Sequence, residues 1–227
     1  FLKVISVFSF FGIFLGVAVL IIVMSVMNGF KTDLTNKILG FNSHIVIKPY
    51  SNSIDEDLKS EIKKITNKSN LNEVYTGEAV ILNNDNLKGI LIKGINFTND
   101  KSNFIKDKLI DGSINYNEKE VIIGKNLAIN LNVVVGDEIS IMSSSFINTP
   151  FGGFPNQQKF KITGVFDSGF YEYDSNVIFL DLDNTLNFFN KTNKDINLEI
   201  FLEEPTKANL VRNQIQNLST EIEVYSW

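Results

Sequence analysis

The residues that could perform chemistry in this 227-residue sequence are few. His44 is the single histidine and cysteine is absent, whereas a Ser-His-Asp triad, a two-histidine metal site or a thiolate zinc site would need more partners. Gly124 and Lys125 lack the upstream glycine of a phosphate-binding P-loop. We therefore interpret His44 as a strand or interface residue, and we expect no ATP binding through a P-loop.

Two groups of carboxylates could bind protons or a cation. Glu172 and Asp174 could share acid-base work, but nothing in the sequence places them in a pocket, so surface charge is favoured. The run from Asp181 to Asn184 resembles the start of a calcium loop, yet its sixth position is Leu186, where such loops need glycine. It is better interpreted as the end of a strand followed by a helix N-cap. An enzyme is therefore the less favoured class of protein.

The composition limits the class of partner and the number of domains. A formal net charge of -5 argues against a nucleic-acid partner. The length allows one medium domain or two small ones. The sequence begins with Phe1 rather than methionine, so we expect it to be a segment of a longer protein.

The N-terminal stretch is typical of a membrane span. No charged residue lies between Lys3 and Lys31, and residues 4–30 exceed the ~20 apolar residues that a bilayer-crossing helix needs. The alternative is a secretory signal peptide, which has a shorter apolar core and a cleavage site that is not evident here. Lysines on both flanks leave the orientation open. Gly12 and Gly16 have the spacing that lets another helix approach, although glycine is also common in membrane helices.

The rest of the sequence alternates strand and helix patterns. Residues 44–50 alternate like a strand, and the next helix pattern has a capping box at Ser53 and Glu56, whose acidic neighbours suit a helix N-terminus. A second strand-helix-strand unit is expected from Ile196 to the C-terminus. Strand and turn signals dominate residues 96–190. The expected fold class is α+β, with one layer domain interrupted by an inserted, mainly-β part.

One apolar segment does not fit these elements. Residues 147–160, INTPFGGFPNQQKF, hold Phe151 and Phe154 between two prolines. Proline removes a backbone donor and glycine weakens regular structure, so we expect a loop. Loops are normally polar. Two phenylalanines in one loop indicate either a docking element or side chains that fold back onto their own subdomain.

Several stretches resemble one family. Residues 25–47, SVMNGFKTDLTNKILGFNSHIVI, are similar to the segment that follows the first membrane span in the LolC/LolE family of lipoprotein-releasing ABC transporter permeases. Residues 121–143, VIIGKNLAINLNVVVGDEISIMS, are similar to the periplasmic core shared with MacB-type and FtsX-type permeases. The run TPFGGFP, followed by FKITGVF, resembles the hook of the LolC-type subunit.

The resemblance implies a permease with four membrane spans and a large periplasmic domain between the first two. In this chain it implies membrane helix 1 at residues 4–30, followed by a MacB-like periplasmic core. A Porter-like α+β part would be formed by residues 41–95 and 191–227. A mainly-β, Sabre-like insertion would occupy residues 96–190 and carry the hook near 147–160.

The resemblance also implies a location and partners. The protein would lie in the bacterial inner membrane, with residues 31–227 in the periplasm. A separate LolD-type ATPase would bind ATP and magnesium, so no cofactor is expected in this chain. A second LolC/LolE-type permease subunit, or a second copy of this chain, would complete the transporter. The cargo would be an acylated lipoprotein, and the hook would recruit a LolA-type periplasmic carrier.

The resemblance assigns roles to individual residues. Met24 and Met27 would line the lipoprotein cavity, although simple helix packing explains them as well, and Gly12 and Gly16 would pack against another helix. Gly153 stands where family hooks often carry a basic residue, which leaves a lysine further along as the nearest cation. The implied hook residues are Pro150, Phe151, Gly152, Gly153, Phe154, Pro155 and Lys159.

Other interpretations remain open at this point. One is a MacB-like exporter or an FtsX-like activator of cell-wall hydrolases, in which mechanotransmission reaches a different partner and no hook is expected. Another is a single-span sensor or membrane-anchored binding module. Further membrane spans downstream would indicate a permease, and their absence an anchored module.

Overall fold

The computed structural model describes residues 2–50, 53–66, 70–83, 86–97, 103–114, 117–149 and 152–226. The chain divides into two compact units, Phe1–Gly40 and Phe41–Trp227. Each is described by itself.

The first unit is a single helix, α1 (Leu2–Phe41). Its segment Leu2–Asp33, 32 residues, is long and apolar enough to cross a membrane, and none of it is buried in the protein. A core helix of a water-soluble domain would cover such a surface with its own protein. The helix predicted over residues 4–30 is therefore present, with an exposed apolar surface that suits hydrocarbon.

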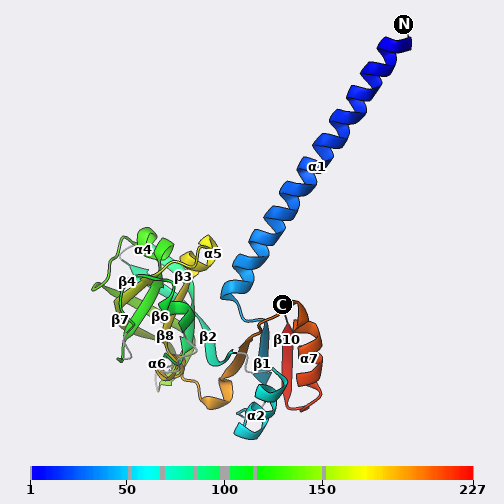
Figure 1. Ribbon diagram of the computed structural model, residues 1–227. Helices are drawn as coiled ribbons and strands as arrows, with labels where there is room; N and C mark the ends of the chain where they lie inside the picture. The colour runs from blue at the N-terminus through cyan, green and yellow to red at the C-terminus, as the bar shows by residue number, and fades with distance from the viewer. Residues whose placement is uncertain are drawn as a thin grey trace. The chain divides into compact units, whose positions relative to one another are not determined.

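The second unit contains a four-stranded antiparallel layer, in the order β10-β1-β9-β2. Two helices pack against it, and their apolar faces join those of the strands in one core that includes Ile47, Ile62 and Ile215. Figure 1 shows these helices, in cyan and orange-red, beside the red strand β10. The elements are β1 (Ile45–Pro49), α2 (Glu56–Ile65), β2 (Asn70–Asn83), η2 (Asn193–Asp195), β9 (Asn197–Phe201), η3 (Pro205–Lys207), α7 (Ala208–Gln216) and β10 (Ile222–Ser226).

Strand β2 and five of the remaining strands close into a barrel, and β4 is attached to it by pairing with β7. β2 pairs with β3, β3 with β8, β8 with β5, β5 with β7, β7 with β6, and β6 again with β2. Its interior is filled by side chains such as Ile81, Ile92 and Phe160. The elements are β3 (Asn86–Ile95), α3 (Asn103–Lys106), β4 (Leu109–Gly112), β5 (Glu120–Gly124), α4 (Lys125–Leu131), β6 (Glu138–Thr149), β7 (Gly152–Phe166), α5 (Tyr171–Asn176), β8 (Val177–Asp181) and α6 (Leu182–Phe189).

Strand β2 belongs to both the layer and the barrel. The strand has 14 residues. Its first segment, Asn70–Val74, pairs with β9, and its later segment, Ala79–Leu82, pairs with β6. The two parts are therefore joined by one continuous strand rather than by a flexible linker. The predicted boundaries of the inserted part, at residues 96 and 190, remain a prediction. Strands β2 and β3 lie before residue 96 in the sequence, yet both belong to the barrel.

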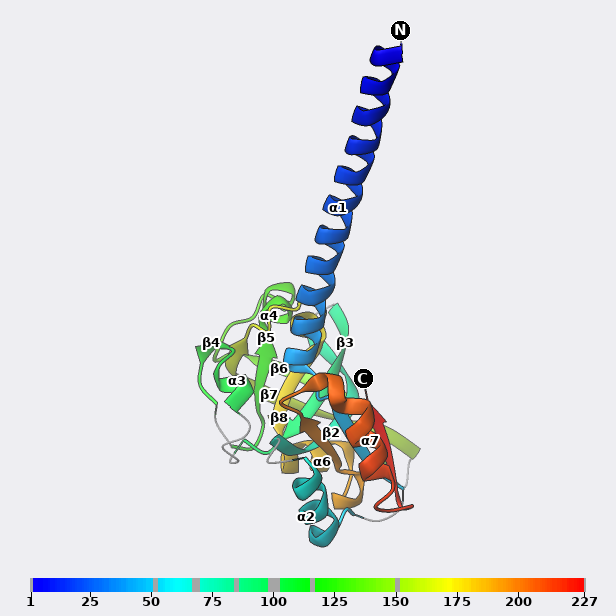
Figure 2. The ribbon, with the colours of Figure 1, turned by 45° about the vertical axis from the view of Figure 1, so that its right-hand side comes forward.

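The two ends of the second unit meet at one edge of the sheet. β1 and β10 pair antiparallel, with Ile45 opposite Ser226. Figure 1 shows the C-terminal strand β10 beside the first strand β1, and Figure 2 shows helix α7 close to the C-terminus. A domain whose ends are neighbours can be inserted between two adjacent membrane segments without a long connection.

The N-terminus of α2 differs from the prediction. Asp55 is the N-cap, and its carboxylate accepts a hydrogen bond from the backbone N–H of Leu58 at 2.8 Å. The capping box predicted at Ser53 and Glu56 is therefore wrong by two residues. Glu56 lies inside the first turn, where its carboxylate binds Lys59 at 2.7 Å. The acidic cluster still serves the helix N-terminus, as expected from the helix dipole.

Candidate functional site

The segment predicted as a docking loop is the outer part of a β-hairpin. β6 and β7 pair antiparallel, from Glu138 opposite Lys161 to Thr149 opposite Gly152. The prediction of a loop is therefore wrong for residues 147–149 and 152–160. Pro150 and Phe151, which complete the implied hook, lie outside the described residues.

The position of this hairpin explains how strands tolerate its prolines and glycines. Within the described residues β6 pairs with β2 only at Ser140–Ser143, so the outer hairpin has free edges, where the missing N–H of Pro155 removes no bond that a central strand would need. Gly152, at the start of β7, has a φ of +118°, which side chains rarely allow. The same residues that argue against a central strand are compatible with an edge hairpin.

A bulge separates the outer hairpin from the barrel wall. Met142 lies opposite Gln157 and Phe146 lies opposite Pro155, so residues 143–145 of β6 face a single residue of β7. Such a bulge bends its strand and increases the local twist. We call the described residues 146–149 and 152–155 the arm, because pairing with the barrel ends at the bulge.

Hydrogen bonds and ring contacts fix the base of the arm. The hydroxyl of Ser143 donates to the carbonyl oxygen of Ser145 at 2.8 Å, inside the bulge. The side-chain amide of Asn156 donates to the carbonyl oxygen of Phe188 in α6 at 2.9 Å. The Phe188 ring meets the buried Phe160 ring edge-on, with centroids 5.4 Å apart. The arm therefore begins at a rigid point of the barrel core.

The arm exposes apolar side chains on both of its faces. Phe146 is 63% exposed and Phe154 is 54% exposed. Phe146 lies opposite Pro155, and since successive side chains point to opposite faces, this pair and Phe154 occupy different faces. Phe154 does not fold back onto its own subdomain, so that alternative fails for this residue.

Lys159 lies at the base of the arm rather than at its end. It pairs with Ser140 in the ladder, and its amine is 3.9 Å from the Glu138 carboxylate. Both side chains are exposed, and such surface pairs contribute little to stability. Its role in docking remains a prediction.

An apolar groove of about 560 Å³ lies where the arm leaves the barrel. The arm contributes Phe146 and Pro155, and the outer surface of the barrel contributes Val80, Leu91 and Met142. The sequence analysis did not find this groove. The available signal was the apolar residues at outward positions of three strands, but the sequence does not reveal that these strands are neighbours.

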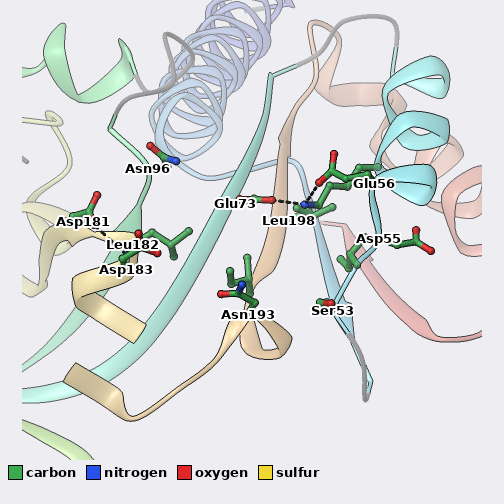
Figure 3. A pocket seen from close by; sticks show the side chains of 13 residues that line it. Ser53, Asp55, Glu56, Glu73, Asn96, Asp181, Leu182, Asp183, Asn193 and Leu198 are labelled. Atoms are coloured by element: carbon green, nitrogen blue, oxygen red, sulfur yellow. Dashed lines mark hydrogen bonds and ion pairs between the residues drawn. The ribbon is translucent and has the colours of Figure 1, made fainter. Parts of the chain in front are cut away.

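A second cavity, of about 520 Å³, is lined by carboxylates and lies between α2 and the start of α6 (Figure 3). Four of its carboxylates, on Asp55, Glu56, Glu73 and Asp181, already have partners in the protein. Asp55 and Asp181 cap helices. The Lys59 amine lies 2.7 Å from the Glu56 carboxylate and 2.5 Å from the Glu73 carboxylate, and dashed lines mark these contacts at Glu56 and Glu73 in Figure 3. In the described part of the chain, no cluster of three or more acidic or histidine side chains could hold a metal ion. We assign no ligand to this cavity.

His44 is a structural residue, as the sequence predicted. It is buried beside β1, and its Nδ1 accepts a hydrogen bond from the backbone N–H of Leu202 at 2.8 Å. Its own backbone N–H donates to the carbonyl oxygen of Ile200 at 2.9 Å. A histidine held in this way connects β1 to β9 and is not presented to a substrate.

The N-cap expected within the run Asp181–Asn184 is Asp181, so α6 begins at Leu182, earlier than the expected helix TLNFFN at residues 185–190. Asp181 accepts the backbone N–H of Asp183 at 3.1 Å. The prediction for the other carboxylate pair is only half right. Glu172 is exposed, whereas Asp174 is only 1% exposed and accepts the backbone N–H of Ser168 at 2.9 Å. Burial raises the pKa of Asp174. The surface interpretation fails for Asp174 because the short helix α5 turns it inward.

A buried ion pair links the layer to the barrel. The Lys93 amine on β3 is 2.8 Å from the Glu199 carboxylate on β9, and the side chains are 9% and 11% exposed. Burial favours a lower pKa for Lys93, but Tyr173 and Glu199 outweigh it, so the pKa of Lys93 is raised. The sequence analysis missed this pair, although Glu199 is the lone charge of β9 and Lys93 follows the apolar run Ile90–Ile92 of β3.

The residues singled out in α1 are exposed within that unit. A Cβ added at Gly12 or Gly16 would meet no other atom within 4 Å. The side chains of Met24 and Met27 are also exposed. Their predicted roles in helix packing and in a lipoprotein cavity remain predictions.

Comparison with known proteins identifies relatives along the whole chain. The chain is 29% identical to the lipoprotein-releasing system transmembrane protein LolC of Buchnera aphidicola subsp. Schizaphis graminum, over 100% of this chain and 57% of that protein. It is 25% identical to LolC of Neisseria meningitidis serogroup B, over 92% of this chain and 52% of that protein. The chain thus spans about half the length of the curated relatives it matches.

Among solved structures, the fold resembles the extracellular domain of the noncanonic ABC-type transporter YknZ from Gram-positive bacteria. The TM-score is 0.51 at 11% identity, over 80% of this chain and 99% of that domain. At this identity the likeness concerns the fold alone. The family model of the MacB-like periplasmic core domain matches residues 6–218, from the apolar helix through the layer and the barrel. Because this match covers nearly the whole chain, the protein belongs to the family of MacB-like periplasmic core domains.

Proposed function

We propose that this chain is the first membrane span and the periplasmic domain of a permease subunit of an ABC transporter. The transporter would draw lipoproteins from the bacterial inner membrane and pass them to a periplasmic carrier. The observation that carries this proposal is the similarity to LolC, named as lipoprotein-releasing, over 100% of the chain. A LolD-type ATPase would hydrolyse ATP, and a second permease subunit, or a second copy, would complete the assembly.

The arm is the part of the domain best suited to dock a carrier of the LolA type. Exposed aromatic side chains dominate small interfaces, because a rigid ring buries a large apolar area at low entropic cost. Phe154 is such an anchor, and the neighbouring Gly152 and Gly153 let a partner approach the backbone closely. The base fixed by Asn156 limits the ordering that binding would require.

Helix α1 would face the cargo and the second permease subunit. The exposed Met24 and Met27 are flexible and polarizable, which suits an irregular acyl surface. Gly12 and Gly16 leave room for another helix at close distance.

Carrier binding by arm variants tests the proposal. Phe154→Ala, alone and with Phe151→Ala, should weaken binding of the purified protein to a LolA-type carrier at least tenfold, since loss of an aromatic anchor commonly costs about 2 kcal/mol. The melting temperature should hardly change, because the Phe154 side chain is exposed. Leu210→Ala, which removes an equally exposed side chain on α7, should leave carrier binding intact. Unchanged binding in the arm variants would remove the docking role.

A second candidate is favoured by the family model and by the YknZ-like fold, neither of which is specific to lipoproteins. In a MacB-like or FtsX-like permease the periplasmic domain transmits motion to another partner. This alternative would be supported if the arm variants did not affect lipoprotein release and the transporter moved a different cargo.

A further inference from the structure

The outer surface of the barrel carries an apolar patch at the base of the arm. Val80, Leu91 and Met142 project from the neighbouring strands β2, β3 and β6, and Leu91 is 40% exposed. Outward positions of such strands are normally polar. A contiguous exposed apolar patch generally marks a binding surface.

The patch is hollow because of two features of the chain. Gly89 lies opposite Val80 on the floor of the groove, and a Cβ added there would meet no atom within 4 Å. Pairing of β6 with β2 ends at Ser143, and beyond the bulge Phe146 and Pro155 form one wall of the groove. The resulting volume of about 560 Å³ is within the range of small-molecule sites.

The lining of the groove suits hydrocarbon better than peptide or headgroup. Among the described residues that line it there is no lysine or arginine, and Glu78 is the single charged side chain. The Ser143 hydroxyl donates to Ser145 at 2.8 Å, and the Asn176 amide donates to the carbonyl oxygen of Glu172 at 2.8 Å. A polar ligand loses free energy when its groups find no partners, whereas an alkyl chain needs none.

We propose that this groove shelters one acyl chain of the cargo while a carrier is docked on the arm. This inference rests on the proposed function and adds a lipid-binding site to it. Each methylene that passes through water costs about 0.8 kcal/mol, so an apolar groove beside the arm lowers the free energy of a partly extracted chain. The flexible Met142 adapts to the irregular shape of such a chain.

Photo-labelling of the full-length protein in lipid nanodiscs tests the site. The probe is palmitic acid carrying a diazirine, and mass spectrometry locates its adducts. We expect adducts at Val80, Leu91 and Met142. A Cβ at position 89 would meet no atom within 4 Å, so the leucine of Gly89→Leu would extend into the floor of the groove. It should lower the adduct yield about tenfold, which corresponds to ~1.4 kcal/mol of affinity. The melting temperature should not fall, because glycine weakens a strand. Ile129→Ser, at an exposed apolar residue of α4 outside the groove, should leave the yield unchanged.

Carrier binding by the same variants separates this proposal from the previous one. Gly89→Leu should still bind the carrier, and Phe154→Ala should still give groove adducts. The acyl site is overturned if no adducts map to the groove, or if Gly89→Leu leaves their yield unchanged. It is also overturned if Gly89→Leu impairs only carrier binding or only self-association, since the occupant would then be the carrier or a second copy. Loss of the docking role alone would leave the adducts in place.

Discussion

Asp174 shows how a single buried carboxyl makes stability depend on pH. Its pKa is raised by burial, in spite of the hydrogen bond from Ser168. The neighbouring Asp167 behaves in the opposite way, because its hydrogen bond to Lys125 lowers its pKa. Between the ordinary and the raised pKa of Asp174, the folded state binds more protons than the unfolded state. Its contribution to stability therefore decreases as the pH rises through the folded pKa.

Asp174→Asn should remove this loss of stability. The asparagine oxygen can still accept the Ser168 N–H, but the group no longer has to ionise. We expect the free energy of unfolding of the variant to equal or exceed that of the unmutated protein at pH 7. The advantage should shrink as the pH falls below the raised pKa. Asp167→Asn should be less stable than the unmutated protein at pH 7 and approach it at low pH. Denaturant titrations between pH 3 and 8 measure both, and a variant of Asp174 whose deficit grows with pH would contradict this account.

At the scale of the elements, two close contacts join helices and strands that are far apart in the sequence. β5 ends at Gly124, which begins α4, and α5 crosses this junction so closely that a Cβ at Gly124 would lie 2.1 Å from the Asp174 carbonyl oxygen. The Lys93–Glu199 pair joins β3 to β9 across β2. Both contacts connect segments that are far apart in the sequence, and the Lys93–Glu199 pair adds to strand β2 a second connection between the layer and the barrel.

Gly124→Ala should therefore damage the fold, although alanine is the smallest change possible. Backbone atoms must move apart by more than an ångström, and we expect a loss of about 3 kcal/mol or more. Gly89→Ala is the matched control, because its Cβ would enter open space in a strand. Thermal unfolding should show a clearly lower melting temperature for Gly124→Ala and no decrease in melting temperature for Gly89→Ala. Equal melting temperatures would show that α5 can move away from β5.

At the scale of the whole molecule, the local periodicity of the sequence predicted the elements but not the pairing between distant strands. The strand and helix periods at both ends of the sequence predicted an interrupted α+β layer, since periodicity is a local property. Closure of the barrel depends on pairs such as Val80 with Met142, which no local pattern reveals. The groove was missed for the same reason. The arm was predicted as a loop because Pro155 and Gly152 were judged as if in a central strand, and Asp174 as exposed because α5 is too short to show a period.

The proposed function, rather than the lysines that flank the span, predicts which side of the membrane each part occupies. The apolar surface of α1 is unburied, and the domain begins and ends at neighbouring strands, with Ile45 opposite Ser226. Since the chain has no cysteine, a single introduced thiol reports its own location. Ser113→Cys, at an exposed position after β4, should react with a membrane-impermeant thiol reagent once the outer membrane is permeabilised. Lys3→Cys, on the other flank of the span, should react only after the inner membrane is broken. Labelling in the reverse order would place the domain in the cytoplasm, where neither a periplasmic carrier nor the arm could act as proposed.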